Sequence, residues 1–116
     1  MLLSQKLVNR YQALKQEVPD CILLMQVGAF MQIMNEDAQA VSGVTDLKLQ
    51  LTGEVNAPIV VGGFPVSGME KSIGKLVRAG HSIAIAMQDE NKERQITEII
   101  RVQLSKKSDF VKKSDC

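Results

Sequence analysis

The segment Val27-Gly28-Ala29-Phe30-Met31-Gln32 decides how this chain folds. It follows the unbroken apolar run Cys21-Ile22-Leu23-Leu24-Met25, which is typical of a strand covered on both faces. A glycine at position 28 lets the backbone bend sharply, so the next aromatic ring can be held out from the sheet. We therefore predict a strand, a bend and a second strand over residues 31–34, with Phe30 presented to solvent at the rim of the sheet.

The composition fits one compact domain with an aliphatic core. The chain has 116 residues, 45% of them hydrophobic and 23% charged, with 3% aromatic residues and no Trp. Fourteen basic residues oppose thirteen acidic ones, for a net charge of +1. This balance argues against a protein that holds nucleic acid by charge alone, because such domains are usually clearly basic. Binding to DNA through its shape stays open.

Two features of the chain indicate its cellular setting. No apolar stretch is long enough to span a bilayer, and the first residues turn polar too early for a signal peptide, so we expect a cytoplasmic protein without a membrane partner. Cys21 lies inside an apolar strand pattern and Cys116 is the last residue. Cysteines in such different settings predict neither a disulfide nor a metal site, and Cys21 reads as a small core residue.

Local signals predict the elements in the first half of the chain. Apolar residues at helical spacing indicate a first helix that ends at Val18-Pro19, because proline disfavours helical geometry in the residue before it. After the strand over 31–34, Asn35 is the expected N-cap of a short helix, with Glu36 and Asp37 in its first turn. Ser42-Gly43 is expected to close that helix.

The second half predicts a hairpin, a helix and two further strands. Leu47, Leu49 and Leu51 alternate with polar residues, which is typical of a strand with one solvated face, and residues 59–61 return after a turn over 53–58. A flexible link over 62–65 leads to a helix that opens on the capping box Ser67 and Glu70 and ends at Gly80. Strands are expected over 82–87 and 96–102.

These elements predict an α/β (α+β) fold in a single domain over residues 1–104. Its mixed sheet would have about six strands, and about three helices would flank it. Residues 105–116 repeat Lys-Lys-Ser-Asp, which predicts a polar, disordered tail.

The sequence offers no catalytic set. It has no nucleophile with a base at a recognisable spacing, and His81 reads as a surface residue after Gly80. Residues 68–76 resemble a phosphate-binding loop, but they have one residue too many between the glycines and Leu76 where Ser or Thr must reach magnesium. We therefore expect no enzyme activity and no cofactor in this chain.

Several short segments, in a shared order over residues 10 to 102, carry a family resemblance. They include Tyr11-Gln12-Ala13-Leu14-Lys15, Val27-Gly28-Ala29-Phe30, Gly63-Phe64-Pro65 and Lys75-Leu76-Val77-Arg78-Ala79-Gly80. In this order the chain resembles the N-terminal mismatch-recognition domain, domain I, of the MutS family of DNA mismatch repair proteins. The resemblance implies that ATP and Mg²⁺ would belong to the ATPase domain of the family, which this chain does not carry.

The resemblance assigns DNA-binding roles to Gly28, Phe30, Met31 and Gln32. It implies that Phe30 enters the minor groove and stacks on a mismatched or unpaired base, because weakened base steps cost less to unstack and bend. Gln32 stands where the family has a glutamate that hydrogen-bonds the stacked base, and an amide keeps a donor and an acceptor without the charge. Ala29 and Met31 depart from the usual Asp and aromatic residue, and Gln26 from a usual basic residue.

Each of these residues also has a plainer interpretation. Without the family, Phe30 would be a core aromatic beside a bend and Gln32 a solvent-facing strand residue. Lys71, Lys75 and Arg78 form a basic stripe on one helix, either secondary phosphate contacts or simply the solvated face.

Two functions therefore stand beside one another. The first is a module that binds double-stranded DNA with mismatched or unpaired bases in mismatch repair. The second is a stand-alone protein-interaction module, derived from the same domain, that binds other repair or mobile-element proteins and no longer reads mismatches. A basic rim around Phe30 would favour DNA, and an apolar or acidic rim a protein partner.

Overall fold

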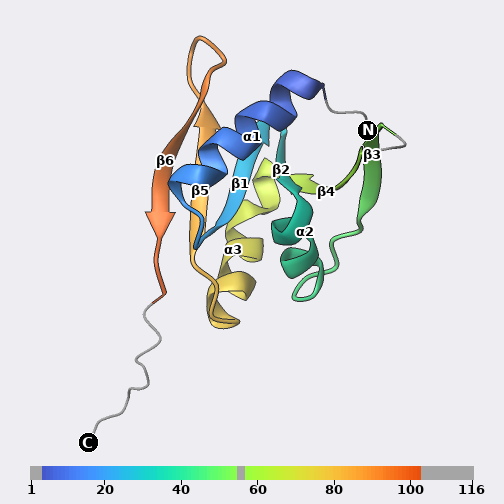
Figure 1. Ribbon diagram of the computed structural model, residues 1–116. Coiled ribbons are helices and arrows are strands. Elements are labelled where there is room, and N and C mark those ends of the chain that lie inside the picture. Colours follow the sequence, from blue (N-terminus) through green and yellow to red (C-terminus); the bar gives the residue numbers. More distant parts are fainter. Residues whose placement is uncertain (1–3, 55–56, 103–116) are drawn as a thin grey trace, which may run out of the picture.

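The computed structural model describes residues 4–54 and 57–102, which form one mixed sheet flanked by helices (Figure 1). The elements in chain order are α1 (Gln5–Glu17), β1 (Ile22–Val27), β2 (Phe30–Met34), α2 (Asn35–Ser42), β3 (Gln50–Glu54), β4 (Ala57–Pro65), the short 3₁₀ helix η1 (Val66–Gly68), α3 (Met69–Arg78), β5 (Ile83–Gln88) and β6 (Arg94–Ile100). The predicted fold class, with six strands and three α-helices, is confirmed.

The strands lie in the order β3-β4-β2-β1-β5-β6, so β1 and β2 occupy the centre of the sheet. β1 pairs antiparallel with β2 and parallel with β5, and the remaining pairs are antiparallel. Side chains of β1 alternate between two buried clusters: Leu23 and Met25 pack with α1, whereas Ile22 and Leu24 pack with residues of α2 and α3. The unbroken apolar run of β1 is therefore explained by burial on both faces.

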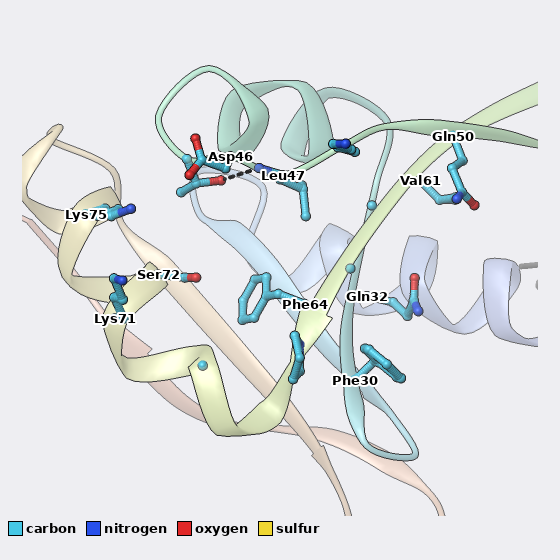
Figure 2. A pocket seen from close by; sticks show the side chains of 16 residues that line it. Phe30, Gln32, Asp46, Leu47, Gln50, Val61, Phe64, Lys71, Ser72 and Lys75 are labelled. Carbon is cyan, nitrogen blue, oxygen red and sulfur yellow. Dashed lines mark hydrogen bonds between the residues drawn. The ribbon is translucent and has the colours of Figure 1, made fainter.

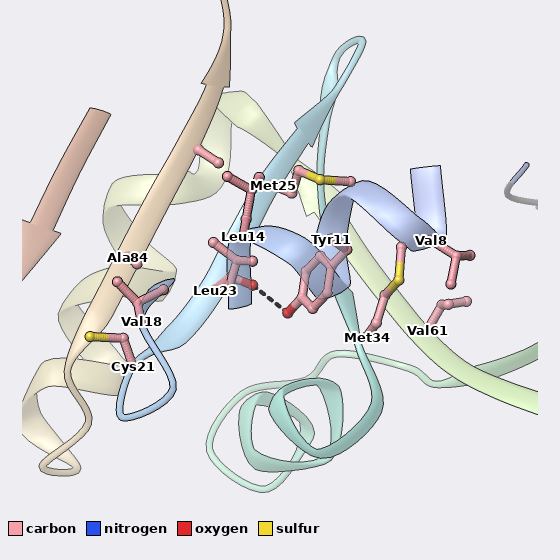
Figure 3. Close-up of a cluster of buried hydrophobic side chains, with 11 residues drawn as sticks. Val8, Tyr11, Leu14, Val18, Cys21, Leu23, Met25, Met34, Val61 and Ala84 are labelled. Carbon is pink, nitrogen blue, oxygen red and sulfur yellow. Dashed lines mark hydrogen bonds between the residues drawn. The ribbon is translucent and has the colours of Figure 1, made fainter. Parts of the chain in front are cut away.

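Helix α1 covers one face of the sheet through an apolar stripe (Figure 3). Val8, Tyr11 and Leu14 recur at helical spacing and are all buried, with Val18 closing the helix as predicted. The Tyr11 hydroxyl lies 2.6 Å from the carbonyl oxygen of Leu23 and donates to it, which fastens α1 to the central strand.

The buried carboxylate of Asp37 joins three elements. Its Oδ1 accepts from Lys15 Nζ at 3.0 Å, and its Oδ2 accepts from the backbone N–H of Leu23 at 3.0 Å and lies 3.1 Å from the Tyr11 hydroxyl. A buried charge is tolerated where it is paired and hydrogen-bonded in this way. Asp37 therefore does more than complement the dipole of α2, which was the role expected from its place in the first helical turn.

The predicted starts of two helices are wrong. Asn35 is the first residue of α2 rather than its N-cap, and Met34 caps the helix without a side-chain hydrogen bond. Because β2 runs straight into α2, Asn35 itself makes the turn, with a φ of +57° that asparagine tolerates. Ser67 lies in η1, and α3 begins at Met69 without a side-chain cap, since the 3₁₀ turn already accepts the N–H of Met69 at the Val66 carbonyl.

The β3–β4 hairpin also differs from its prediction. Strand β3 begins at Gln50, and it exposes Leu51 and buries Thr52, the reverse of the expected pattern. A shift of one residue in register exchanges the two faces of a strand, so the alternation of leucines alone could not fix which face is buried. Residues 62–65, expected as a flexible link, belong to β4 and pair with β2.

Three further expectations concern parts of the chain beyond these elements. Cys21 is buried and free, as predicted, and burial raises the pKa of its thiol. The expected tail over 105–116 and the boundary at residue 104 lie outside the described residues. Within the described ranges, no helix has the length and apolar character that crossing a membrane requires.

Candidate nucleic-acid interface

A two-residue turn at Gly28 and Ala29 presents the ring of Phe30. Val27 pairs with Phe30 across this turn, and Gly28 has a φ of +63°, as a type II′ hairpin turn requires at its first central position. Phe30 is the first residue of β2, and 41% of its surface is exposed. The predicted bend and the predicted exposure of this ring are both confirmed.

The far side of the same turn is attached to the end of β4. Phe30 pairs with Pro65, and the backbone N–H of Val66 donates to the Ala29 carbonyl at 2.8 Å. The strand that carries Phe30 is therefore paired on both sides, with β1 on one and β4 on the other. Strand pairing on both sides fixes the backbone of Phe30, while part of its side chain stays exposed to solvent.

A hollow of about 610 Å³ runs around the open edge of β4 beside Phe30 (Figure 2). It exists because β3 pairs with β4 no further than Val61, so residues 62–65 pair with β2 alone among the described strands. Figure 2 shows Phe30 and Gln32 on one side of the β2–β4 pair, and Phe64 with Lys71 and Lys75 of α3 on the other. Two aromatic rings thus flank this edge.

Two glycines of β4 allow neighbouring side chains to approach its backbone closely. A Cβ atom on Gly62 would lie 2.6 Å from Cδ2 of Leu47, and one on Gly63 would lie 3.1 Å from Nε2 of Gln32. Both neighbouring side chains therefore pack directly against bare backbone. Leu47 is held there by its loop, since its N–H donates to Thr45 Oγ1 and its carbonyl accepts from Ser42 Oγ, each at 3.1 Å.

The rim of the hollow is basic. Three of its lining residues, Lys48, Lys71 and Lys75, are cationic, and Asp46 is the one carboxylate among them. Arg78, predicted with the two α3 lysines, does not line the hollow, and its guanidinium lies beside Gly74. Lys48 was not predicted as a site residue, because its place between two leucines indicates only the solvated face of a strand.

The four residues to which the resemblance assigned DNA-binding roles differ in exposure and position. Phe30 and Gln32 share one side of β2 and line the same hollow, although only 3% of Gln32 is exposed. Gly28 is exposed in the turn, whereas Met31 is fully buried in the cluster shared with α2 and α3. The Met31 side chain presents no surface to a ligand, because adjacent residues of a strand point to opposite faces. Its predicted contact with DNA therefore finds no support here.

The amino-acid sequence of this chain matches a known protein family. The family model described as MutS domain I matches residues 5–109. This chain belongs to the MutS domain I family. The domain is also 35% identical over 95 residues to a protein named DNA mismatch repair protein MutS from Erythrobacter litoralis (strain HTCC2594). That match covers 78% of this chain and 11% of the relative, so the chain spans about a tenth of the relative's length.

Across residues 4–54 and 57–102, no group of three or more His, Cys, Asp or Glu side chains could hold a metal ion. Residues 68–76, which resemble a phosphate-binding loop in sequence, instead form the end of η1 and most of α3. The three lysines that line the hollow around the edge of β4 are cationic groups that could contact a polyanion.

Proposed function

We propose that this MutS domain I binds double-stranded DNA at mismatched, bent or unpaired sites and inserts Phe30 from the minor groove between neighbouring bases. The observation that carries the proposal is the exposed phenyl ring on a backbone paired on both sides. A mispaired step costs less to unstack than a paired one, so an apolar ring pushed against the stack reports local weakness rather than sequence. The role needs neither ATP nor a metal ion from this chain.

Neighbouring groups would support the inserted ring. Gln32 lies two residues beyond Phe30 on the same side of β2, where its amide would hydrogen-bond the stacked base. Lys48, Lys71 and Lys75 would contact phosphates, because DNA carries its charge along the backbone. The basic rim favours this role over a module that only binds protein, and the role implies a cytoplasmic, nucleoid-associated location.

The wedge is tested by titrating fluorescent duplexes, with and without a mismatch, with the native chain and with Phe30→Ala. Stacking of a base on an aromatic ring contributes about 1–3 kcal/mol, so we expect affinity for the mismatched duplex to fall by roughly five- to 150-fold. Affinity for the perfect duplex should change little. Ile99→Ala is the matched control, because Ile99 is 44% exposed but lies on β6, the far edge strand of the sheet. Equal binding of both duplexes, whatever residue stands at position 30, would contradict the wedge.

The phosphate contacts are tested by the dependence of binding on salt. Lys71→Gln or Lys75→Gln should each weaken binding to both duplexes and reduce the slope of log affinity against log salt by about one. Arg78→Gln on the same helix serves as the control, since Arg78 lies outside the hollow. An unchanged slope in both lysine variants would remove α3 from the interface.

A second candidate function rests on the edge strand β3. Leu51 is 73% exposed there, and Leu49 just before the strand is also exposed, which favours a contact with protein. Under this candidate the domain would bind another repair or mobile-element protein through β3, and DNA binding would not depend on Phe30. The Phe30→Ala titration therefore separates the two candidates.

A further inference from the structure

We propose that Gln26 and Gln88 form a side-chain clamp that fixes the turn at Gly28 and Ala29 and thereby positions Phe30 for insertion. The proposal rests on the proposed function, since a positioned ring matters only if the ring inserts. Gln26 lies near the end of β1 and Gln88 is the last residue of β5. Both would be positioning residues rather than groups that contact the bases.

Three hydrogen bonds close the clamp. The backbone N–H of Gly28 donates to Gln88 Oε1 at 2.9 Å, and Gln26 Nε2 donates to the Gly28 carbonyl at 3.1 Å. The backbone N–H of Gln88 donates to Gln26 Oε1 at 2.8 Å. Both backbone groups of Gly28 are thus bound by side chains, and the Gln26 side chain also binds the backbone N–H of Gln88 at the end of β5. These partners fix which end of each amide is the donor and which the acceptor.

The clamp joins β1 and β5 beyond the point where their backbones pair. β1 and β5 pair from Ile22 with Ile83 up to Met25 with Ala86. Beyond that point their backbones no longer pair, and the two glutamine side chains bridge the strands instead. This bridge lies at the place where the turn begins, so the turn is joined to β5 although no ladder reaches it.

Two arginines connect the clamp to β6 and α1 through hydrogen bonds. Arg94 Nε donates to the Gln26 carbonyl at 2.5 Å, and Arg10 donates through Nε and Nη2 to the Arg94 carbonyl at 3.0 and 2.5 Å. A series of contacts therefore runs from α1 through the start of β6 to the turn. On the other flank, Val66 holds the Ala29 carbonyl. A turn fixed on both flanks loses less conformational freedom when its ring is inserted, which favours binding.

The two glutamines have different chemical requirements, which gives a sharp test. Toward Gly28, Gln88 offers only an acceptor, so Gln88→Glu keeps that hydrogen bond whereas Gln88→Ala removes it. Gln26 uses its donor and its acceptor. Gln26→Glu would lose the donor and place a negative oxygen against the Gly28 carbonyl. The same replacement is therefore tolerated at position 88 and damaging at position 26.

The clamp itself is measured by hydrogen exchange of the Gly28 amide in the free protein, followed by NMR. Loss of one hydrogen bond should speed this exchange about five- to tenfold in Gln88→Ala, with Gln88→Glu close to the native rate. The amide of Leu24, inside β1, is the internal control and should not change. A native rate at Gly28 in Gln88→Ala would overturn the clamp.

The positioning role is measured as the ratio of affinities for mismatched and perfect duplexes. Gln88→Ala and Gln26→Glu should lower this ratio about three- to tenfold, because a mobile ring must be ordered on insertion. Gln88→Glu should keep the native ratio, because repulsion by its charge weakens both duplexes alike. A native ratio in Gln88→Ala, together with faster Gly28 exchange, would overturn the positioning role. Failure of Phe30→Ala to change binding would instead overturn the proposed function, and the exchange result would still report on the clamp.

Discussion

The two hairpins of this domain differ in how many neighbours hold them. The β1–β2 hairpin lies in the centre of the sheet, with β5 and β4 on its flanks and side-chain contacts at its turn. The β3–β4 hairpin lies at one edge of the sheet, and among the described strands its outer strand β3 pairs only with β4. It exposes Leu51, and among the described residues the buried hydroxyl of Thr52 has no hydrogen-bond partner.

This contrast indicates where the domain can present a side chain precisely. A ring at the tip of the central hairpin is positioned by strands, a turn and side chains together. A leucine on the edge strand has one neighbouring strand to position it, and its exposure is of the kind that serves adaptable contacts. The following changes would break or sharpen the contrast, beginning with the largest expected effect.

Removing the buried Leu24 of β1 should have the largest effect. Leu24→Ala would leave a cavity in the cluster shared with α2 and α3, and such changes cost about 2–5 kcal/mol. Chemical denaturation of the native and variant proteins measures this loss. A loss below about 1 kcal/mol, which is that of an average point mutation rather than of a new cavity, would contradict tight packing of the central hairpin.

Adding a methyl group to Gly62 should weaken the edge of β4. Because the new Cβ would lie 2.6 Å from Leu47 Cδ2, Gly62→Ala must displace Leu47, at a cost of about 1–3 kcal/mol. Gly43→Ala is the control, since its Cβ would have only ordinary contacts. If thermal unfolding shows the same stability for both variants, Leu47 does not pack on Gly62 as described.

Alkaline pH should loosen the attachment of α1 to the central hairpin. Burial, and then the charge of Asp37, raises the pKa of Tyr11 well above its ordinary value. Its contribution is fully present below about pH 10, where tyrosine is protonated in both states, and is lost above it at up to about 1.4 kcal/mol per pH unit as the unfolded chain ionises first. Denaturation at several pH values measures this slope, and Tyr11→Phe should remove it. A variant that keeps the full slope would assign it to other groups.

Truncating the exposed Leu51 of β3 should have the smallest effect. Leu51→Ala removes a side chain that is mostly in water, so stability should stay within about 0.5 kcal/mol of the native value. Measured beside Leu24→Ala in the same denaturation experiment, this variant shows how the stability loss from a Leu→Ala change differs between the two hairpins. A loss as large as that of Leu24→Ala would show that β3 is covered in solution.

The sequence was informative where structure depends on neighbours in the chain. The glycine bend, the exposure of Phe30 and the doubly covered strand before it all follow from a few adjacent residues. The register of β3 did not, because Leu47, Leu49 and Leu51 fit either face until β4 fixes the pairing. Contacts between distant residues were also hidden: Gln26 and Gln88 are 62 positions apart, and nothing local marks them as partners.

The direction of β6 has a practical consequence. Its Arg94 pairs with Gln88 near the Phe30 turn, whereas its Ile100 pairs with Ile83, beside the start of β1. The strand therefore carries the chain from the end of the sheet that bears the ring to the opposite end (Figure 1). A biosensor that tethers the protein beyond β6 would leave the Phe30 tip pointing away from the chip and accessible to flowing oligonucleotides.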